Sequence, residues 1–406
     1  MVTGVGLVSP IGIGATDFWD ALVAQRSGIR RLSRFDPSSY SCQVAGEIDD
    51  AAFTHLVHPR KLRNSSRATQ LGLAATTLAL RDAGWQPGDH PPERVGTMLG
   101  TAMGGWVDSE KQYALLLERG ARRVNPFIIN ASAPHAGAGE IAAAVSTRGP
   151  QLTFANGCPA GLLALADASQ RIARGELDAA IAGGAEMPIS PLVFAGMGRT
   201  NELSRHHDPP ATACRPFDAG HDGMVLSEGA CILVLEAEEA ARARGRNIRG
   251  AILGTGSSCD AAGLFDLDLG GTAGAAAVRQ AIESGGTSPA AIDYICAHAN
   301  SGPAFDRKET AVIRAAFGAE AERIPVSSIK GVLGHPFGAA GAFQTAAALL
   351  VIQHQHIPPT ANLEDPDSAC ALHHVRGTAL QARVNQVLVT SYGYGGVNAA
   401  LVIARY

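Results

Sequence analysis

Charged and aromatic side chains are both scarce in this sequence. Of its 406 residues, 17% are charged and 5% are aromatic, whereas 46% are hydrophobic. The high hydrophobic content excludes a disordered chain, which could not bury enough apolar surface to fold. With so few aromatic rings, the core has to be built mainly from alanine, valine, leucine and isoleucine. This composition favours closely packed helices and buried parallel strands.

The sequence also lacks the marks of a nucleic-acid-binding or membrane protein. The formal net charge is only −4, and no basic stripe is interleaved with aromatic residues. No apolar run reaches the ~18 residues typical of a membrane span. The start, Met1–Gly4, has no basic leader followed by an apolar segment, so export is not indicated. We therefore expect a cytoplasmic protein without nucleic-acid or membrane contacts.

The seven cysteines show no paired spacing. An odd number of dispersed thiols in a long chain fits a reducing compartment better than a disulfide scaffold. We interpret six of them as small core residues. Only Cys158 stands in a sequence context that suggests chemistry.

Short apolar segments alternate with amphipathic segments along the whole chain. The apolar segments predict buried strands at 2–8, 95–100, 151–155, 179–182, 230–235, 251–256, 292–297, 386–391 and 399–404. The amphipathic segments predict helices at 71–82, 161–174, 236–244, 272–284, 310–317 and 339–354. Such alternation indicates α/β layers with mostly parallel sheets. Because it begins again after Gly250, we predict two halves of similar plan, residues 1–250 and 251–406, in one body without a linker.

Residues 151–161 predict a strand, a tight turn and the start of a helix, with Cys158 at the turn. Unpaired backbone N–H groups and the positive end of the helix dipole would favour a thiolate at this position. Pro159 fits the first helical turn, where its missing N–H costs nothing. Taken alone, the pattern is more typical of a buried structural cysteine beside a turn.

Three segments downstream change that interpretation. Residues 294–298 form a predicted strand that ends in His298, at the edge where α/β sheets place their chemistry. Residues 327–335 end in His335 and lead into a helix rich in small residues, and 391–398 form a glycine-rich turn with several backbone donors. A cysteine and two histidines on such turns indicate nucleophilic catalysis.

Ordered matches along nearly the whole chain resemble the β-ketoacyl synthase family, of the elongating fatty-acid-synthase and type II polyketide-synthase kind. Beside the segments above, the matches are Val2–Gly6 with Ser9–Pro10, Phe18–Trp19, Ser27–Ile29, Arg148–Pro150, Gly183–Glu186, Arg215–Asp218, Ser227–Ala230, Asp306 with Glu309, and Pro358–Leu363. The resemblance implies an α/β thiolase fold with five αβαβα layers and two similar halves. It also implies a homodimer, or a heterodimer with a related ketosynthase or chain-length-factor subunit.

The resemblance also implies roles for individual residues. Cys158 looks like the acyl-accepting nucleophile, and His298 and His335 look like the pair that supports decarboxylation of a malonyl thioester. Lys330 matches the family lysine that orders the site electrostatically. The backbone N–H groups of Cys158 and Tyr394 would form the oxyanion hole. The implied reaction is a decarboxylative Claisen condensation with malonyl-acyl carrier protein that needs no metal or bound cofactor, because phosphopantetheine arrives on the carrier.

Several positions depart from the family pattern around the cavity. Asn300 and Gly302 stand where the family has threonines that bind the pantetheine arm, and Gln344 stands where a glutamate usually pairs with the family lysine. The gating aromatic, commonly phenylalanine, is Tyr394. Further substrate-binding candidates, Met103 and Met197, match positions that line the acyl channel, although plain core packing explains them almost as well. These departures favour a specialised or polyketide pathway over housekeeping fatty-acid synthesis.

Four basic residues match regions near the pantetheine entrance of the family: Arg60, Lys61, Arg63 and Arg205. Carrier proteins are generally acidic, so these residues are candidates for carrier docking. Solvated surface charge is the plainer interpretation of each one alone.

Two other classes of protein remain open from the residues. One is a thiolase-like condensing acyltransferase that uses coenzyme A, but thiolases place a second reactive cysteine near the C-terminus, where this chain has Ser391–Tyr394. The other is a non-elongating, chain-length-factor-like partner subunit, but such subunits generally lack the nucleophilic cysteine. A module cut from a multidomain synthase is a third reading, which the absence of a flanking linker does not favour.

Overall fold

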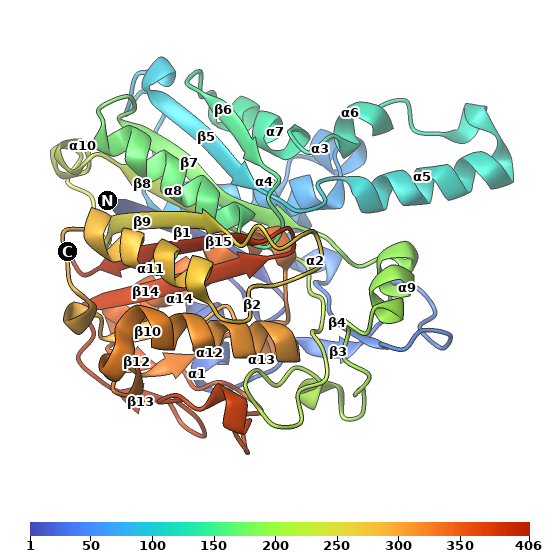
Figure 1. The fold of residues 1–406 in the computed structure, drawn as a ribbon. Coiled ribbons are helices and arrows are strands. Elements are labelled where there is room, and N and C mark those ends of the chain that lie inside the picture. The colour runs from blue at the N-terminus through green and yellow to red at the C-terminus, as the bar shows by residue number, and fades with distance from the viewer.

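A computed structural model describes residues 1–406 as five layers, in which two β-sheets alternate with three layers of helices (Figure 1). The first sheet has the order β2-β1-β8-β7-β5-β6 and the second β11-β10-β14-β15-β9. Helices α8 and α14 fill the space between the sheets, α4 and α7 cover the outer face of the first sheet, and α11 and α12 lie on the outside of the second.

The strands of the first sheet are β1 (Val2–Ser9), β2 (Gly12–Ile13), β5 (Val95–Gly100), β6 (Gln151–Phe154), β7 (Ala179–Glu186) and β8 (Gly229–Glu236). Those of the second are β9 (Ala251–Cys259), β10 (Tyr294–Cys296), β11 (Val326–Ser327), β14 (Gln386–Gly393) and β15 (Val397–Ala404). Two short ribbons pair β3 (Ile29–Arg31) with β4 (Val44–Gly46) and β12 (His356–Ile357) with β13 (Leu380–Gln381).

The helices are α1 (Ala15–Val23), α2 (Asp50–Phe53), α3 (Pro59–Asn64), α4 (Arg67–Asp82), α5 (Trp106–Arg119), α6 (Ile128–Ser132), α7 (Ala136–Val145), α8 (Ala160–Ala173), α9 (Pro191–Arg199), α10 (Glu238–Ala243), α11 (Thr272–Ser284), α12 (Pro303–Phe317), α13 (Lys330–Leu333) and α14 (Ala340–His354). None of them is both long and apolar enough to cross a membrane.

The predicted segments fall on real elements, and two of them, β5 and α11, have the predicted bounds. The helix predicted at 236–244 begins too early, since Glu236 is the last residue of β8 and α10 starts at Glu238. Helix α5 was not predicted. Only one of its residues is buried, and large apolar side chains such as Tyr113 and Leu117 are exposed, because the helix extends from the body as an arm (Figure 1).

The expectation of mostly parallel sheets is wrong, because both sheets are mixed. In the first sheet β5 runs parallel to β6 and β7, whereas β8 is antiparallel to both β1 and β7. In the second sheet β10 is parallel to its neighbours, whereas β15 is antiparallel to β14 and β9. Helices cover both faces of each sheet, so the central strands are buried along nearly their whole length whatever their direction.

Helix α14 shows why the middle layer holds the two sheets together. Thirteen of its residues, from Ala340 to Ile352, are buried on every side of the helix, which is typical of a helix enclosed by protein. The first sheet is built from residues 2–236 and the second from residues 251–404. The division into residues 1–250 and 251–406 as two domains stays a prediction.

Candidate active site

Cys158 lies at the turn between β6 and α8, as the sequence predicted. Gly157 makes the turn with a positive φ of 67°, a conformation that residues with a Cβ rarely adopt. Position 393 also requires a glycine, because the chain there packs closely against the Cys158 turn. A Cβ on residue 393 would lie 3.4 Å from the backbone nitrogen of Cys158 and 2.8 Å from the side chain of Pro159. The glycine-rich turn after β14 is thereby brought against the predicted nucleophile, although it lies far along the chain.

The two predicted histidines lie beside Cys158 in the buried centre of the protein. His335 Nε2 is 3.1 Å from Cys158 Sγ, within hydrogen-bonding distance for sulfur. The rings of His298 and His335 meet edge to face with their centroids 5.3 Å apart. The Nε2 atom of His298 and the Nδ1 atom of His335 are buried and have no partner in the protein. Each of the two imidazoles therefore keeps one ring nitrogen that no protein group binds.

Electrostatics makes this a neutral thiol and two neutral imidazoles at rest. Burial raises the pKa of Cys158 to about 12, and the nearby charge of Lys330 opposes this shift only in part. Burial and Lys330 hold the pKa of both His298 and His335 well below the ordinary value. The thiolate favoured by the sequence argument is therefore not the resting state, and His335 is placed to take the thiol proton when the sulfur attacks.

Lys330 holds the backbone of His298 rather than its ring. Its ammonium group donates to the carbonyl oxygen of His298. Burial lowers the pKa of Lys330 to about 8, and Glu309 on α12 is the first of the groups that oppose this shift. Burial raises the pKa of Glu309 to about 7, and its carboxylate accepts from the backbone N–H of Ala299 at 2.8 Å and the hydroxyl of Thr390 at 2.6 Å. Sequence reasoning gave no role to Glu309, although its position shortly after His298 was the available signal.

Gln344 uses its amide nitrogen more than its amide oxygen. The nitrogen donates to the carbonyl oxygens of Cys296, Ala297 and Thr390 at 3.1, 2.8 and 3.0 Å. The amide oxygen is 3.5 Å from the Lys330 ammonium, at the limit of a hydrogen bond. Gln344 therefore ties the end of β10 to β14 behind His298, a role that a carboxylate cannot fill because it only accepts.

Asn300 and Gly302 form a matched pair in the loop after His298. The side-chain oxygen of Asn300 accepts from the backbone N–H of Gly302 at 2.9 Å. A Cβ on residue 302 would lie 2.9 Å from that same oxygen, so the asparagine side chain fills the space where a threonine side chain would begin. Its amide nitrogen is buried and has no partner.

An apolar pocket of about 550 Å³ opens beside Cys158. Met103, Met197 and Tyr394 line it, as predicted, together with Glu202, which the sequence did not single out. Burial raises the pKa of the Tyr394 hydroxyl, and the neighbouring Glu202 carboxylate adds to the shift.

The four predicted docking residues lie on two segments. Arg60, Lys61 and Arg63 belong to the short helix α3, where Lys61 is paired with Glu140 and the two arginines are exposed. Arg205 is exposed after α9, and its guanidinium contacts Asn201. No group of three or more His, Cys, Asp or Glu side chains is arranged to hold a metal ion.

Comparison with known proteins places the chain among condensing enzymes. Residues 1–241 match the family described as "Beta-ketoacyl synthase, N-terminal domain", and residues 249–364 match its C-terminal domain. The chain is 36% identical over 405 residues to "3-oxoacyl-[acyl-carrier-protein] synthase 2" of Coxiella burnetii, covering 100% of this chain and 98% of that protein. It is 38% identical over 409 residues to "Putative polyketide beta-ketoacyl synthase 1" of Streptomyces halstedii, covering 99% and 97%.

A solved structure described as "The ishigamide ketosynthase/chain length factor" superposes on all of this chain and 98% of its own, with a TM-score of 0.91 and 31% identity. The five-layered thiolase fold predicted from the sequence is thus confirmed, and so is the resemblance on which that prediction rested. The chain belongs to the beta-ketoacyl synthase family of acyltransferases.

Proposed function

We propose that the protein condenses an acyl group held on Cys158 with a malonyl group delivered by an acyl carrier protein. The product is a β-ketoacyl-acyl carrier protein, and carbon dioxide is released. The observation that carries this proposal is the 3.1 Å contact of Cys158 Sγ with His335 Nε2, beside a second neutral imidazole on His298. A proton acceptor for the thiol and donors for a developing oxyanion thus lie within one buried site.

In the first half-reaction the thiol is acylated. The sulfur of Cys158 attacks the carbonyl carbon of the acyl thioester on the carrier, and its proton passes to His335. The backbone N–H groups of Cys158 and Tyr394, which form no backbone–backbone hydrogen bond, stabilise the tetrahedral oxyanion as fixed donors. The carrier thiol leaves with the proton, and the acyl group remains as a thioester on Cys158.

In the second half-reaction the malonyl carboxylate leaves as carbon dioxide, and its electron pair becomes an enolate. Neutral imidazoles on His298 and His335 donate N–H groups to the enolate oxygen, and their free ring nitrogens fit this task. The enolate carbon then attacks the acyl–Cys158 carbonyl, and the thiolate of Cys158 leaves. Lys330, Glu309 and Gln344 touch no reacting atom; they hold the backbone around His298.

The partners we propose are an acyl carrier protein and a second ketosynthase-like subunit. Phosphopantetheine arrives on the carrier and passes Asn300. Three side chains at the acyl pocket, Trp106, Leu192 and Phe265, are more than half exposed, and exposed apolar surface of this kind marks a protein interface. A homodimer or a heterodimer with a chain-length-factor subunit would cover it, as the description of the ishigamide protein pairs these two components. We place the reaction in the cytoplasm.

The pathway we propose is a type II polyketide or specialised fatty-acid pathway. The pocket holds a carboxylate and a phenol, Glu202 and Tyr394, in an otherwise mainly apolar wall. Such a wall suits a chain that carries an oxygen or a double bond better than a purely saturated chain.

Intact-mass measurement after incubation with a panel of acyl carrier proteins tests the proposal. The panel should contain saturated, unsaturated and oxygenated acyl groups of matched length. We expect the protein to gain the mass of one acyl group per chain, and to return to its free mass with release of carbon dioxide when malonyl carrier protein is added. Acylation from coenzyme A thioesters but never from a carrier would favour a thiolase-like enzyme instead.

A further inference from the structure

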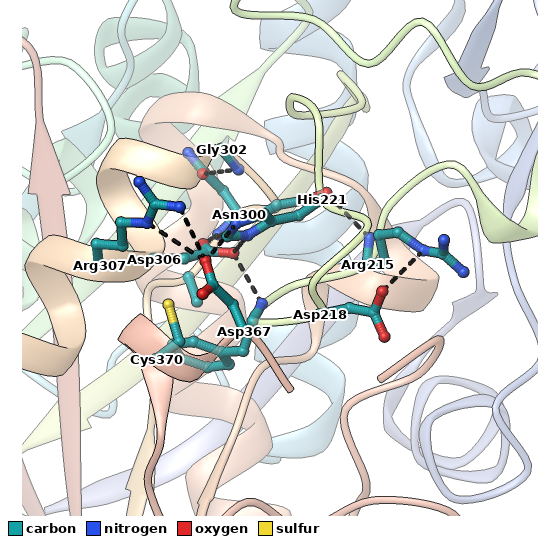
Figure 2. A network of polar contacts seen from close by, with 12 residues as sticks. Arg215, Asp218, His221, Asn300, Gly302, Asp306, Arg307, Asp367 and Cys370 are labelled. Carbon is teal, nitrogen blue, oxygen red and sulfur yellow. Dashed lines mark hydrogen bonds and ion pairs between the residues drawn. The ribbon is translucent and has the colours of Figure 1, made fainter. Parts of the chain in front are cut away.

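A buried histidine, His221, lies between two carboxylates beside the 300–302 loop that follows His298 (Figure 2). His221 Nδ1 is 2.9 Å from Asp306 Oδ2, and His221 Nε2 is 3.2 Å from Asp367 Oδ2. The imidazole side chain is only 3% exposed, and that of Asp306 is fully buried. Both ring nitrogens thus face an acceptor, and only the doubly protonated imidazolium can donate to both.

The carboxylate of Asp306 connects this histidine to the loop that follows His298. Its Oδ1 atom accepts from the backbone N–H groups of Asn300 and Ser301 at 3.0 and 3.2 Å. Its Oδ2 atom accepts from Phe217 as well as from His221. Asp306 belongs to the first turn of α12, so the helix start and the loop are fixed by one side chain.

The loop needs such support because its backbone is strained. Ser301 has a φ of +73°, and a residue with a Cβ keeps this conformation only where the surroundings enforce it. Besides Asp306, the hydroxyl of Ser301 accepts from the N–H of Arg215 at 3.0 Å, and its carbonyl accepts from the N–H of Gly223 at 3.1 Å. Both donors belong to the same 215–223 segment that carries His221.

We propose that His221, in its imidazolium form, is a positioning residue that clamps the 300–302 loop through Asp306 and so holds His298 in its catalytic place. Loss of one proton leaves a neutral ring with a single N–H. One of the two carboxylates then faces a bare nitrogen lone pair, and the clamp opens. The role in catalysis rests on the proposed condensation, whereas the clamp itself does not.

The charges around His221 support the imidazolium form. The charged groups that face it are Asp306 from α12 and Asp367, the N-cap of the short 3-10 helix 368–370. Arg307 pairs with the same Asp367 oxygen at 3.1 Å, and on the histidine's own segment Arg215 lies 3.6 Å from Asp218, while Asp222 accepts from Ser204 and Arg205. Without the imidazolium, Asp306 is left in the interior with no cation in contact.

The sign of the pH dependence follows from these contacts. Burial opposes the charge on His221, but Asp306 and Asp367 more than offset burial, so the pKa of His221 is raised above its ordinary value. A raised pKa in the folded protein means that the stabilisation is complete at acidic pH and is lost as pH rises through the folded value. The clamp therefore opens on the alkaline side.

Two variants separate a proton-dependent clamp from plain packing. His221→Arg supplies several donors that keep their charge at every relevant pH, and His221→Gln supplies a neutral amide that never carries it. His55→Gln, at an exposed histidine remote from these contacts, is the matched control. Each protein is measured for its melting temperature and for the rate of malonyl decarboxylation between pH 6 and pH 9, and the His221 imidazole is titrated by NMR of ¹³C-labelled histidine, assigned by its loss in His221→Arg.

We expect the melting temperature of wild type to exceed that of His221→Gln at pH 6, with the difference shrinking as pH rises. We expect the alkaline fall in decarboxylation to move upward by about one pH unit in His221→Arg, a tenfold change in proton concentration, and not to move in His55→Gln. If His221→Gln does not fold, the NMR titration of wild type and the pH profile of His221→Arg still test the clamp. An imidazole that titrates at or below its ordinary value, or the same pH profiles in wild type and His221→Arg, would overturn the clamp. A protein without any decarboxylation but with the expected melting and NMR behaviour would overturn the proposed function and keep the clamp.

Discussion

Cys158 Sγ and His335 Nε2 lie 3.1 Å apart although 177 positions separate the two residues in the chain. The close contact of two glycines makes this approach possible. A Cβ on Gly161, in the first turn of α8, would lie 2.7 Å from the carbonyl oxygen of Gly338, just after His335. The start of α8, which follows Cys158, is thereby packed against the turn that carries His335. The chemistry of Cys158 and His335 is therefore the first property to test.

Cys158→Ala should abolish acylation and condensation and leave the fold intact, because it removes the attacking sulfur and little volume. Intact-mass spectrometry after incubation with acyl carrier protein measures the loss. Cys231→Ala removes a different buried thiol, in β8, and this protein should still be acylated. Acyl mass on the Cys158→Ala protein would contradict the assignment of the nucleophile.

His298→Ala should impair malonyl decarboxylation more than acylation of Cys158. The reason is geometric: His335 contacts the sulfur directly, whereas His298 meets the ring of His335 at its edge and keeps a free nitrogen. Single-turnover acylation and the release of carbon dioxide from malonyl carrier protein measure the two steps separately. An equal loss in both steps would count against this division of roles.

Gln344→Glu should lower decarboxylation, and the loss should grow as pH rises and the new carboxyl group ionises. A carboxylate would face the carbonyl oxygens of Cys296, Ala297 and Thr390 without a proton to offer. Leaving such buried groups unpaired costs roughly 1–3 kcal/mol for each group. Gln353→Glu, at an exposed position on the same helix, should show neither effect. A pH-independent, wild-type rate in Gln344→Glu would refute the role of the Gln344 amide in holding the backbone behind His298.

Charge reversal of Arg63 and Arg205 together should raise the apparent KM for carrier protein and weaken its dependence on salt, since both are exposed and carriers are generally acidic. Steady-state kinetics at low and high ionic strength provide the test. Reversal of Arg279 and Arg323, which lie on other exposed parts of the surface, controls for the change in net charge. An unchanged KM at low salt would remove these residues from the docking surface.

Tyr394→Phe should improve the loading of saturated acyl groups relative to oxygenated or unsaturated ones, because it removes the hydroxyl from the pocket beside Cys158. Glu202→Gln should change the same ratio in wild type, and much less in the Tyr394→Phe background, since the carboxylate and the phenol are neighbours in one pocket. Competitive acylation with chains of matched length, read by mass spectrometry, gives the ratio. Fully additive effects of the two substitutions would show that the pair does not act together.

Much of the architecture could be predicted from the sequence. The strand–turn–helix around Cys158 is a local pattern, and so are the turns that carry His298 and His335, because turn glycines and apolar periodicity act over a few residues. The resemblance then supplied the five-layered fold and the grouping of the catalytic residues. Strand direction was not available in this way, and β8 and β15 proved antiparallel to their neighbours.

The sequence by itself determined which residue types stand on which turns, and therefore the family and its chemistry. Only the tertiary structure decided their charge states and contacts. A thiol at a helix start favours the thiolate, but burial raises the pKa of Cys158 to about 12 and reverses that conclusion. In the same way, the pKa of His221 is raised because folding brings Asp306 and Asp367 against its two ring nitrogens. Desolvation and long-range pairing depend on groups that are distant in the chain, so no local pattern contains them.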